Sequence, residues 1–353
     1  METQSQKTKI ENQPPMLRCD GVSKFFGRNA GASASRDLRR LSDAELREQG
    51  LVAAVRDASF EVARGETFVI MGLSGSGKST LLRCLTRLIE PTYGNVVVDG
   101  ADVTAADERE LIEIRRRKMG MVFQHFALLP NRSVLGNVLF PMQVQGVDAK
   151  TANARALELL TLVGLQGLEH RRPSELSGGQ QQRVGIARSL ATDPPVWFLD
   201  EPFSALDPLI RMDLQAELLR LQATLAKTTV FVTHDLDEAI RLADRIAIME
   251  HGRIVQIGSP EDLVLNPATA YVKRFVSEVP LSKVVSVGRL TKDGTPPANA
   301  MPLPAGSVIG DLAEDILGGP DVFAVTRADG KVLGVLEKSS ALRILANLEE
   351  NRS

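Results

Sequence analysis

Several residue types are scarce in this chain of 353 residues. It contains 2 cysteines, 1 tryptophan and 2 tyrosines, and aromatic residues make up 4% of the whole. The two cysteines, Cys19 and Cys84, are too few for a disulfide framework and lack the spacing of a metal site. Cys84 is expected to be a core residue rather than a reactive thiol. A formal net charge of −2 gives no general attraction to nucleic acid or anionic lipid, so no nucleic-acid partner is expected.

Long hydrophobic runs are also missing. No apolar stretch approaches the roughly 20 residues of a membrane-spanning helix. Residues 1–13 are polar and lack the apolar stretch of a signal peptide. The chain is therefore expected to stay in the cytosol. With 43% hydrophobic residues over this length, it can bury a full core and is expected to hold about two domains.

The clearest motif is a glycine-rich loop at residues 72–80, Gly-Leu-Ser-Gly-Ser-Gly-Lys-Ser-Thr, which follows the apolar run 67–71. A strand that enters such a loop and leaves it as a helix points backbone N–H groups at one place, where a phosphate chain can bind. Lys78 is expected to reach the β- and γ-phosphates, and Ser79 to offer its hydroxyl to Mg²⁺. The predicted ATP-binding residues of this loop are Gly72, Leu73, Ser74, Gly75, Ser76, Gly77, Lys78, Ser79 and Thr80.

A second candidate cluster follows another buried-type strand at residues 195–199, which ends in Asp200 and Glu201. Two carboxylates beside an apolar core are costly unless they have a function. Asp200 fits the acid that holds Mg²⁺, and Glu201 fits the base that takes a proton from an attacking water. The alternative is an acid pair that simply faces solvent at the end of a strand.

Between these clusters lies Leu-Ser-Gly-Gly-Gln at residues 176–180, followed by a helical pattern over residues 184–191. This pentapeptide is the signature of the ATP-binding-cassette (ABC) ATPases, and the chain resembles that family over about residues 16–280. The resemblance implies further site residues, each at a motif position of the family. They are Phe26, which stacks on adenine, Gln124 of the Q-loop, Asp207 of the D-loop at residues 204–207, and the switch histidine His234.

The resemblance also implies a fold and an assembly. The fold is an α/β P-loop cassette with a mixed-sheet core, an antiparallel β subdomain and a helical lobe. ATP binds between the phosphate loop of one subunit and the signature of another, so the working unit is a homodimer that holds two nucleotides with Mg²⁺. The implied catalytic residues are Glu201, His234 and Gln124. The implied Mg²⁺ ligands are Ser79, Gln124 and Asp200, and the signature residues that bind ATP are Ser177, Gly178, Gly179 and Gln180.

Two further segments belong to the base-binding part of the cassette. Residues 16–30 and 52–71 are expected to supply strands of the antiparallel subdomain. Between them, residues 30–50 form a helical insertion in which Ser42 and Glu45 make a capping box. The pattern favours a surface helix packed on the domain, with a partner contact as the alternative.

The helical lobe is expected over residues 125–178. In the family, this lobe and the Q-loop receive a short helix of a membrane permease. The apolar string at residues 126–130 fits such a contact, or else ordinary packing between lobes. The basic run at residues 115–118 fits a solvated helix face better than a lipid or nucleic-acid site.

The composition changes near the C-terminal end. Residues 281–306, with a stretch rich in Pro, Gly and Ala at 291–306, are expected to be a linker. Residues 307–349 show the order helix, strand, turn, strand, helix, with strands expected at 322–326 and 332–336. This order resembles a single cystathionine-β-synthase-type (CBS) regulatory module. Because such modules normally occur in tandem, two copies are expected to pair across the dimer.

Among ABC ATPases, the chain is most similar to ATP-binding subunits of bacterial glycine betaine/proline-type (quaternary amine) uptake systems. The expected function is ATP hydrolysis that powers import of a quaternary amine osmolyte through a membrane permease, with an external binding protein. The subunit is expected at the cytoplasmic face of the bacterial inner membrane. Choline, carnitine or an amino acid are alternative cargoes. A soluble ABC ATPase of translation or DNA repair is a further alternative, but the second cassette or coiled-coil insertion usual there is missing. The motifs behind the likeness lie at residues 69–78, 87–92, 204–211 and 234–239.

Overall fold

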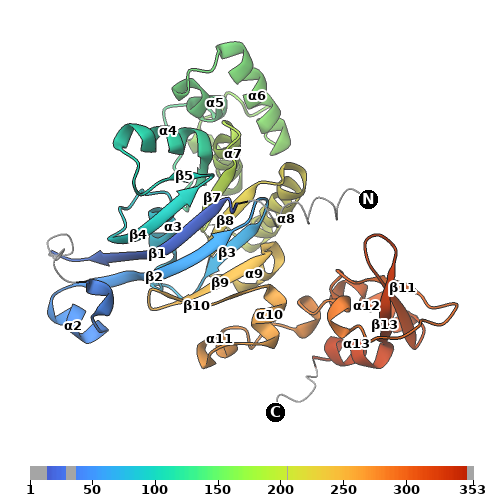
Figure 1. The fold of residues 1–353 in the computed structure, drawn as a ribbon. Helices are drawn as coiled ribbons and strands as arrows, with labels where there is room; N and C mark the ends of the chain where they lie inside the picture. Colours follow the sequence, from blue (N-terminus) through green and yellow to red (C-terminus); the bar gives the residue numbers. More distant parts are fainter. Residues whose placement is uncertain (1–13, 29–36, 205, 348–353) are drawn as a thin grey trace. The chain divides into compact units, whose positions relative to one another are not determined.

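The computed structural model describes residues 14–28, 37–204 and 206–347 (Figure 1). This part of the chain forms two compact units, one within residues 8–257 and one within residues 258–353. The first unit holds all motifs of the predicted nucleotide site. Residues 30–36 of the predicted insertion, residue 205 of the predicted D-loop and the end of the predicted C-terminal module lie outside the described residues.

The first unit contains an antiparallel sheet with the strand order β2-β1-β4-β5. Buried and exposed side chains alternate over most of β2, because one face of the sheet packs on the core and the other does not. This sheet is the antiparallel subdomain expected from the sequence. Its strands are β1 (Leu17–Phe26), β2 (Val52–Val62), β4 (Tyr93–Val98) and β5 (Ala101–Asp102).

The segment between β1 and β2 carries a short 3-10 helix (Leu38–Arg40) and the helix α2 (Asp43–Glu48). The predicted capping box is present, since Glu45 N donates to Ser42 Oγ at 3.3 Å and Ser42 N donates to Glu45 Oε2 at 2.7 Å. Three leucines of this segment are buried beside Phe25 of β1, so the insertion packs on the domain as expected. They are Leu38, Leu46 and Leu51.

A second sheet in the first unit has the strand order β10-β9-β3-β8-β7-β6. The pairs from β9 through β3, β8 and β7 to β6 are parallel. All five residues of β3 and of β7 are buried, as expected for parallel strands covered on both faces. The strands are β3 (Thr67–Met71), β6 (Met119–Val122), β7 (Val196–Asp200), β8 (Thr228–Thr233), β9 (Arg245–Glu250) and β10 (Arg253–Gly258).

One expectation about the strands is wrong. Residues 52–71 were predicted to lie in the antiparallel subdomain, but β3 belongs to the parallel sheet, between β8 and β9. The turn at residues 63–66 passes the chain from one sheet to the other. The physical reason is that four of the five residues of β3 are apolar and all five are buried, with no alternation of apolar and polar side chains, so the strand is stable only inside a sheet covered on both faces.

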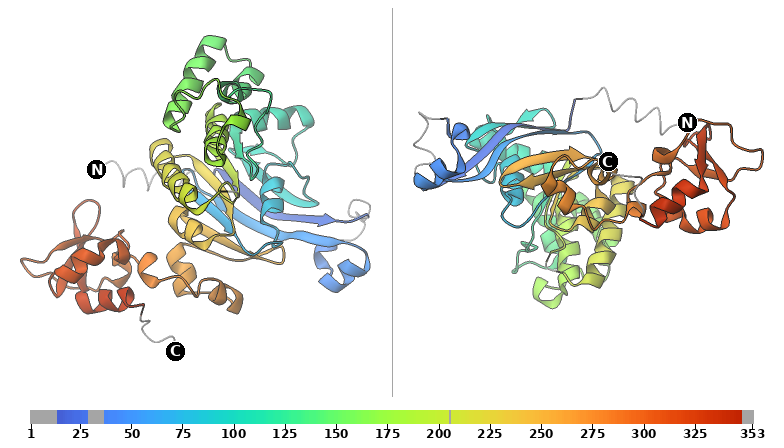
Figure 2. Two further views of the ribbon diagram at one scale, coloured as in Figure 1. Left: turned by 180° about the vertical axis from the view of Figure 1, so that it is seen from behind. Right: turned by 90° about the horizontal axis from the view of Figure 1, so that it is seen from below.

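Helices cover these sheets and form a separate lobe. Seen from behind, α5 and α6 lie with α7 at one end of the first unit (Figure 2). This is the helical lobe predicted for residues 125–178, and a 3-10 helix (Pro173–Glu175) leads into α7. The helices are α3 (Lys78–Leu85), α4 (Glu108–Lys118), α5 (Val134–Val144), α6 (Ala149–Leu162), α7 (Gly178–Leu190), α8 (Pro208–Leu225) and α9 (Leu236–Leu242).

The basic run at residues 115–118 forms the last turn of α4. Arg115 Nε donates to the carbonyl oxygen of Thr86 at 3.1 Å, and Lys118 forms an ion pair with Asp99 at 3.2 Å. Arg116 and Arg117 both pair with Glu113 on the same helix. These cations are therefore largely engaged within the protein and favourably placed at the helix C-terminus.

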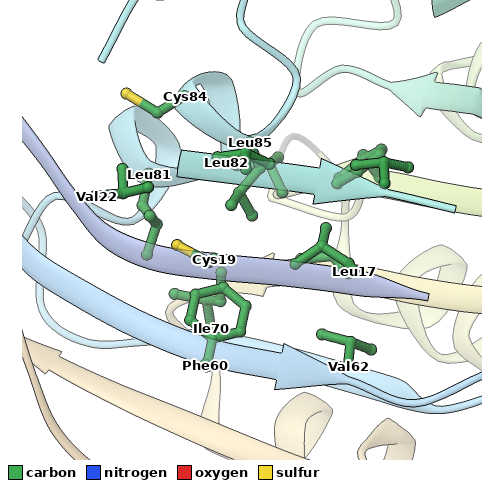
Figure 3. Packing of buried hydrophobic residues seen from close by; sticks show 14 of the residues in the cluster. Leu17, Cys19, Val22, Phe60, Val62, Ile70, Leu81, Leu82, Cys84 and Leu85 are labelled. Atoms are coloured by element: carbon green, nitrogen blue, oxygen red, sulfur yellow. The ribbon is translucent and has the colours of Figure 1, made fainter. Parts of the chain in front are cut away.

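Side chains of β1, β2 and α3 meet in the core of the first unit (Figure 3). Cys84 lies among them as a buried residue, as predicted, and burial raises the pKa of its thiol to about 12. Burial also raises the pKa of the Cys19 thiol. Both thiols are therefore protonated at neutral pH and poor nucleophiles.

The second unit is built around a small sheet of order β11-β12-β13. β11 pairs with β12 in parallel, and β12 pairs with β13 in antiparallel fashion. The two strands predicted here are present. The elements are α10 (Pro260–Leu265), α11 (Ala270–Phe275), β11 (Pro302–Pro304), α12 (Ala313–Gly318), β12 (Val322–Thr326), β13 (Val332–Glu337), α13 (Lys338–Leu345) and the 3-10 helices Leu281–Lys283, Val287–Leu290 and Ile309–Leu312.

The prediction that residues 281–306 form a linker is wrong. Val285 and Val287 are buried, and Leu303 of β11 is 1% exposed. The backbone of Lys292 exchanges two hydrogen bonds with Val335 of β13, each at 2.9 Å. The prolines suggested a linker, but they allow β11 because a sheet-edge strand needs fewer N–H donors. This segment is therefore part of the second unit.

We expect the single tryptophan to report on the stability of the parallel sheet. Trp197 of β7 is fully buried, and its Nε1–H donates to Ser189 Oγ at 2.7 Å. Ser189→Ala leaves this donor without its partner and should cost about 1–3 kcal/mol of unfolding free energy. Urea unfolding followed by tryptophan fluorescence measures the loss. Thr224→Ala, which removes an exposed hydroxyl on α8, is the control, and equal midpoints for the two variants would contradict the expectation.

Candidate active site

The phosphate loop connects β3 to α3 in a conformation that only glycine fits. Gly77, the N-cap of α3, has φ +102°, and Gly72 has φ +152°. A Cβ atom at Gly77 would collide with the carbonyl oxygen of Ala54, and one at Gly72 would collide with that of Met249. Glycine alone combines this left-handed backbone with so close an approach. The loop is therefore clamped between β2 and β9, with the N-terminus of α3 open to an anion.

Lys78 is buried in the centre of this loop. Its Nζ donates to the carbonyl oxygens of Gly72 at 2.9 Å and Leu73 at 3.1 Å. Burial lowers the pKa of Lys78, while the nearby carboxylates of Glu201 and Asp200 act in the opposite direction. A buried ammonium with carboxylates close by and a helix N-terminus beside it matches a site for a bound polyphosphate.

Glu201 and His234 come together from the ends of two neighbouring strands. Glu201 follows β7 and His234 follows β8, and His234 Nδ1 lies 3.0 Å from Glu201 Oε2. Glu201 has φ +45°, a conformation that non-glycine residues rarely adopt and that persists only where the surroundings fix it. Its backbone N–H donates to Val232 O at 3.0 Å and so fixes it to β8. The geometry places a carboxylate and an imidazole at the same point.

The loop that carries His234 is held by its neighbours. Thr233 Oγ1 donates to Glu238 Oε2 at 2.6 Å, and the same hydroxyl accepts from Asp235 N at 3.0 Å. Asp235 is the N-cap of α9 and accepts from Glu238 N at 3.1 Å. These bonds make the turn between β8 and α9 stiff, so His234 is held at the edge of the sheet.

Asp200 lies beneath this pair at the end of β7 and is 1% exposed. Its Oδ2 accepts a 3.3 Å contact from Arg83 Nη2, whereas Oδ1 has no hydrogen-bond partner within the described residues. A buried carboxylate oxygen without a partner is costly unless a cation or donor meets it. Mg²⁺ commonly binds one or two carboxylates together with phosphate oxygens. Asp200 therefore fits a ligand of Mg²⁺, and Ser79 in the first turn of α3 offers a hydroxyl at the wall of the cavity described next.

Lys78, Glu201 and His234 line one cavity of about 690 Å³, whereas the buried Asp200 is not part of its wall. Most of the predicted phosphate-loop residues line it, together with Gln124 between β6 and the helical lobe. Gly72 and Ser76 are not part of its wall. They contact the other side of the loop, at Met249 and Gly252. The lining residues are Val52, Ala53, Ala54, Leu73, Ser74, Gly75, Gly77, Lys78, Ser79, Thr80, Gln124, Glu201 and His234.

Phe26 stands at the end of β1, 42% exposed, and outside the wall of the cavity. It pairs in register with Val52 of β2, which does line the cavity. Lys24 Nζ lies 5.1 Å from the centre of its ring. The role of Phe26 in stacking on adenine stays a prediction, since the ring lies outside the wall of the cavity and Lys24 lies over it.

The signature residues lie away from this cavity. Ser177 is the exposed N-cap of α7, and it forms a capping box with Gln180. A Cβ at Gly179 would lie 2.5 Å from a side-chain carbon of Ile210 on α8, just after the exposed Asp207. The signature and the D-loop are therefore neighbours of each other, but none of these residues lines the cavity. Within one chain, the signature and the cavity around the phosphate loop are therefore separate.

Sequence reasoning missed several residues of the site. Val52, Ala53 and Ala54 at the start of β2 form one wall of the cavity. They carry no chemical signal, because they act through backbone and small side chains. Arg83, the partner of Asp200, had a weak signal as the charged residue of an otherwise largely buried helix.

Comparisons with known proteins agree with this geometry. Residues 55–204 match the family model described as "ABC transporter". The chain is 48% identical, over 95% of its length and 99% of the relative, to the trimethylamine N-oxide transport system ATP-binding protein of Pelagibacter ubique. It is 48% identical, over 79% of its length and 70% of the relative, to the glycine betaine/proline betaine transport system ATP-binding protein of Escherichia coli.

A solved structure is also similar. It is a dimeric, post-hydrolysis ATP-binding cassette bound to ADP and Pi, with 33% identity and a TM-score of 0.59. The match covers 69% of this chain and 99% of that one. Among the helices that the structure describes here, none is both long enough and apolar enough to cross a membrane.

The close approach at Gly77 gives a test of the site. Gly77→Ala should weaken binding of a fluorescent ATP analogue at least about tenfold, because the methyl group meets Ala54 O in a left-handed backbone. Gly146→Ala is the matched control, since its φ of +76° carries similar strain but its Cβ meets nothing within 4 Å. Unchanged affinity in Gly77→Ala, with wild-type circular dichroism, would show that the loop does not bind nucleotide.

Proposed function

The chain belongs to the ATP-binding subunits of ABC transporters, and from this premise we propose that it hydrolyses ATP to power the import of a methylated amine osmolyte. The observation that carries the proposal is the match of 48% identity over 95% of the chain to a trimethylamine N-oxide transport protein. A second such protein, from Ruegeria pomeroyi, is 51% identical over 94% of the chain. Glycine betaine transport proteins give the same chemical class of cargo.

Within this class, trimethylamine N-oxide is the first cargo to test. The trimethylamine N-oxide relatives are matched over 97–99% of their own length. The betaine relatives from Bacillus subtilis and Escherichia coli are matched over 78% and 70% of theirs, although the first of these also aligns over 94% of this chain. An amino acid is less supported, because a methionine import protein aligns over 65% of the chain. The transported molecule itself does not meet this subunit, so the cargo is inferred from relatives.

The residues of the cavity divide the work of hydrolysis. Lys78 and the N–H groups of the phosphate loop bind the β- and γ-phosphates, and Glu201 accepts the proton of the attacking water. His234, 3.0 Å from Glu201, holds that carboxylate and contacts the γ-phosphate. Ser79, Asp200 and Gln124 would hold Mg²⁺, which would neutralise charge on the phosphates.

A second copy of the chain completes the site. Ser177, Gly178 and the rest of the signature lie outside their own cavity, yet they form a helix N-terminus suited to phosphate. In a two-fold dimer, the signature of each copy caps the nucleotide of the other. Loss of the γ-phosphate removes that link, so hydrolysis opens the dimer.

A second cavity, of about 350 Å³, suits a permease segment. It lies between β6, the Q-loop and α5, and its wall combines apolar side chains with three arginines. An inserted helix with apolar and acidic side chains would complement both. We place the subunit at the cytoplasmic face of the membrane because its relatives are ATP-binding subunits of transport systems. The wall includes Arg115, Arg116, Met121, Phe123, Leu129, Phe140, Val144 and Arg188.

The second unit is proposed to be regulatory. Its order of strands and helices resembles one CBS module, and we propose that two copies pair across the dimer. Its sheet contains both predicted strands, at Val322–Thr326 and Val332–Glu337. Because residues 281–306 are folded into this unit, the boundary between the ATPase unit and the proposed regulatory unit lies before residue 281.

Removing the base tests the hydrolysis step. Glu201→Gln keeps the size of the side chain but cannot accept a proton, so turnover should fall about 10²–10⁴-fold while ATP still binds. The ATP-bound variant should elute from gel filtration as a dimer. Normal hydrolysis by this variant would show that Glu201 is not the base.

Transport tests the cargo. Full-length chain with its permease and binding protein, in cells that lack amine uptake, should accumulate radiolabelled trimethylamine N-oxide or glycine betaine. The Glu201→Gln variant should abolish uptake because transport depends on hydrolysis. Labelled methionine serves as the control cargo. Uptake of methionine in place of both amines would overturn the assignment of the cargo and leave the ATPase assignment intact.

A further inference from the structure

Arg188, in the last turn of the signature helix α7, reaches the segment that follows Gln124. Its Nη1 donates to the carbonyl oxygen of Ala127 at 2.7 Å, and its Nη2 donates to that of Phe126 at 3.0 Å. A guanidinium presents its donors in a fixed planar fork, so one side chain can bind two successive carbonyls. This arginine therefore joins the C-terminal end of α7 to the Q-loop.

The two carbonyls belong to an unusual turn. The φ angle is +55° at Phe126 and +46° at Ala127. Side-chain-bearing residues rarely adopt this region, and two in succession persist only where the surroundings fix them. Phe126 N donates to Phe123 O at 3.2 Å, and Arg188 binds both carbonyls. The turn sets the direction of the chain immediately after Gln124.

The same turn lies along α7 from its start. Gly178 and Gly185 are seven residues apart and therefore lie on one face of the helix. A Cβ at Gly178 would lie 3.9 Å from Phe126 Cζ, and one at Gly185 would lie 3.7 Å from Phe126 O. The contact thus runs from the signature to Arg188. Helix α7 therefore connects the signature, which we propose binds the nucleotide of the second copy, to the turn beside Gln124.

The charge of Arg188 is not explained by an ion pair. Burial lowers the pKa of Arg188, and no carboxylate of the described residues forms an ion pair with it. Arg188 is partly buried, and a cation removed from water is costly unless its donors are bonded, as the two carbonyl oxygens bond them here. Arg183 on the same helix differs, because it pairs with Glu217 at 3.4 Å and donates to Val163 O at 2.9 Å.

We propose that Arg188 is a positioning residue for hydrolysis, which holds the turn at Phe126 and Ala127 so that Gln124 stays at the nucleotide cavity and moves together with α7. The inference rests on the proposed function, since Gln124 has a role only if ATP is hydrolysed there. Gln124 lines the nucleotide cavity and Arg188 does not. Arg188 lines the neighbouring cavity instead, so it acts on the reaction through Gln124.

A double-mutant cycle in the full-length chain tests this coupling. Arg188→Gln should lower kcat for ATP at least tenfold and leave KM within twofold, because Arg188 does not touch the nucleotide. If it acts through Gln124, the variant with both Arg188→Gln and Gln124→Ala should be no slower than the slower single variant. Binding of ATP without Mg²⁺ should be unchanged in Arg188→Gln, which a general loss of folding would not permit.

Arg183→Gln is the matched control, because Arg183 is also half-buried on α7 and also bonds a backbone carbonyl. Its effect should multiply with that of Gln124→Ala. Arg188→Lys keeps the charge without the fork and should recover only part of kcat; it replaces Arg188→Gln in the cycle if that variant does not fold. If the losses of kcat from Arg188→Gln and Gln124→Ala multiply in the double variant, the inference about Arg188 is overturned and the proposed function stands. A wild-type chain that hydrolyses no ATP would overturn the proposed function and this inference with it.

Discussion

The structure depends on the close approach of the phosphate loop to two other strands. Gly77 has no space for a Cβ because Ala54 O of β2 occupies it, and Gly252 N donates to Ser76 O at 3.0 Å. Arg56 N in turn donates to Gly252 O at 2.7 Å. Backbone atoms of the antiparallel sheet, the turn between β9 and β10 and the loop are thus joined. Because backbone N–H groups of the loop form the phosphate site, these three segments must be held in fixed positions.

From that cradle follows the arrangement of the acids. β7 and β8 are neighbours in the parallel sheet, so the residues that follow them, Glu201 and His234, meet at its edge. Asp200 is still within β7 and stays buried below them. The boundary between strand and turn therefore separates two adjacent carboxylates. Asp200 stays buried in β7, where we propose that it binds a cation, and Glu201 meets His234 in the turn, where we propose that it accepts a proton.

The helical lobe connects the two halves of the mechanism. The signature lies at one end of α7, where we propose that a second copy binds, whereas Arg188 near its other end bonds the turn after Gln124. The neighbouring cavity, lined by the same turn, is open to a permease segment. A shift at any of these three places can reach the others through one helix. This gives a physical route from hydrolysis to transport.

The sequence by itself predicted the phosphate loop, the signature and the carboxylate pair. It also predicted the strands β1, β2 and β12. Each of these follows from local spacing and side-chain type. It failed at residues 281–306, where prolines suggested a linker, and at β3, which belongs to the parallel sheet. Only the tertiary structure decided that His234 meets Glu201, that Asp200 Oδ1 has no hydrogen-bond partner in the described part of the chain and that Arg188 bonds the turn beside Gln124. These facts depend on contacts between residues far apart in the chain. Many of these contacts are made to backbone carbonyls, which every residue has, so residue type alone does not predict them.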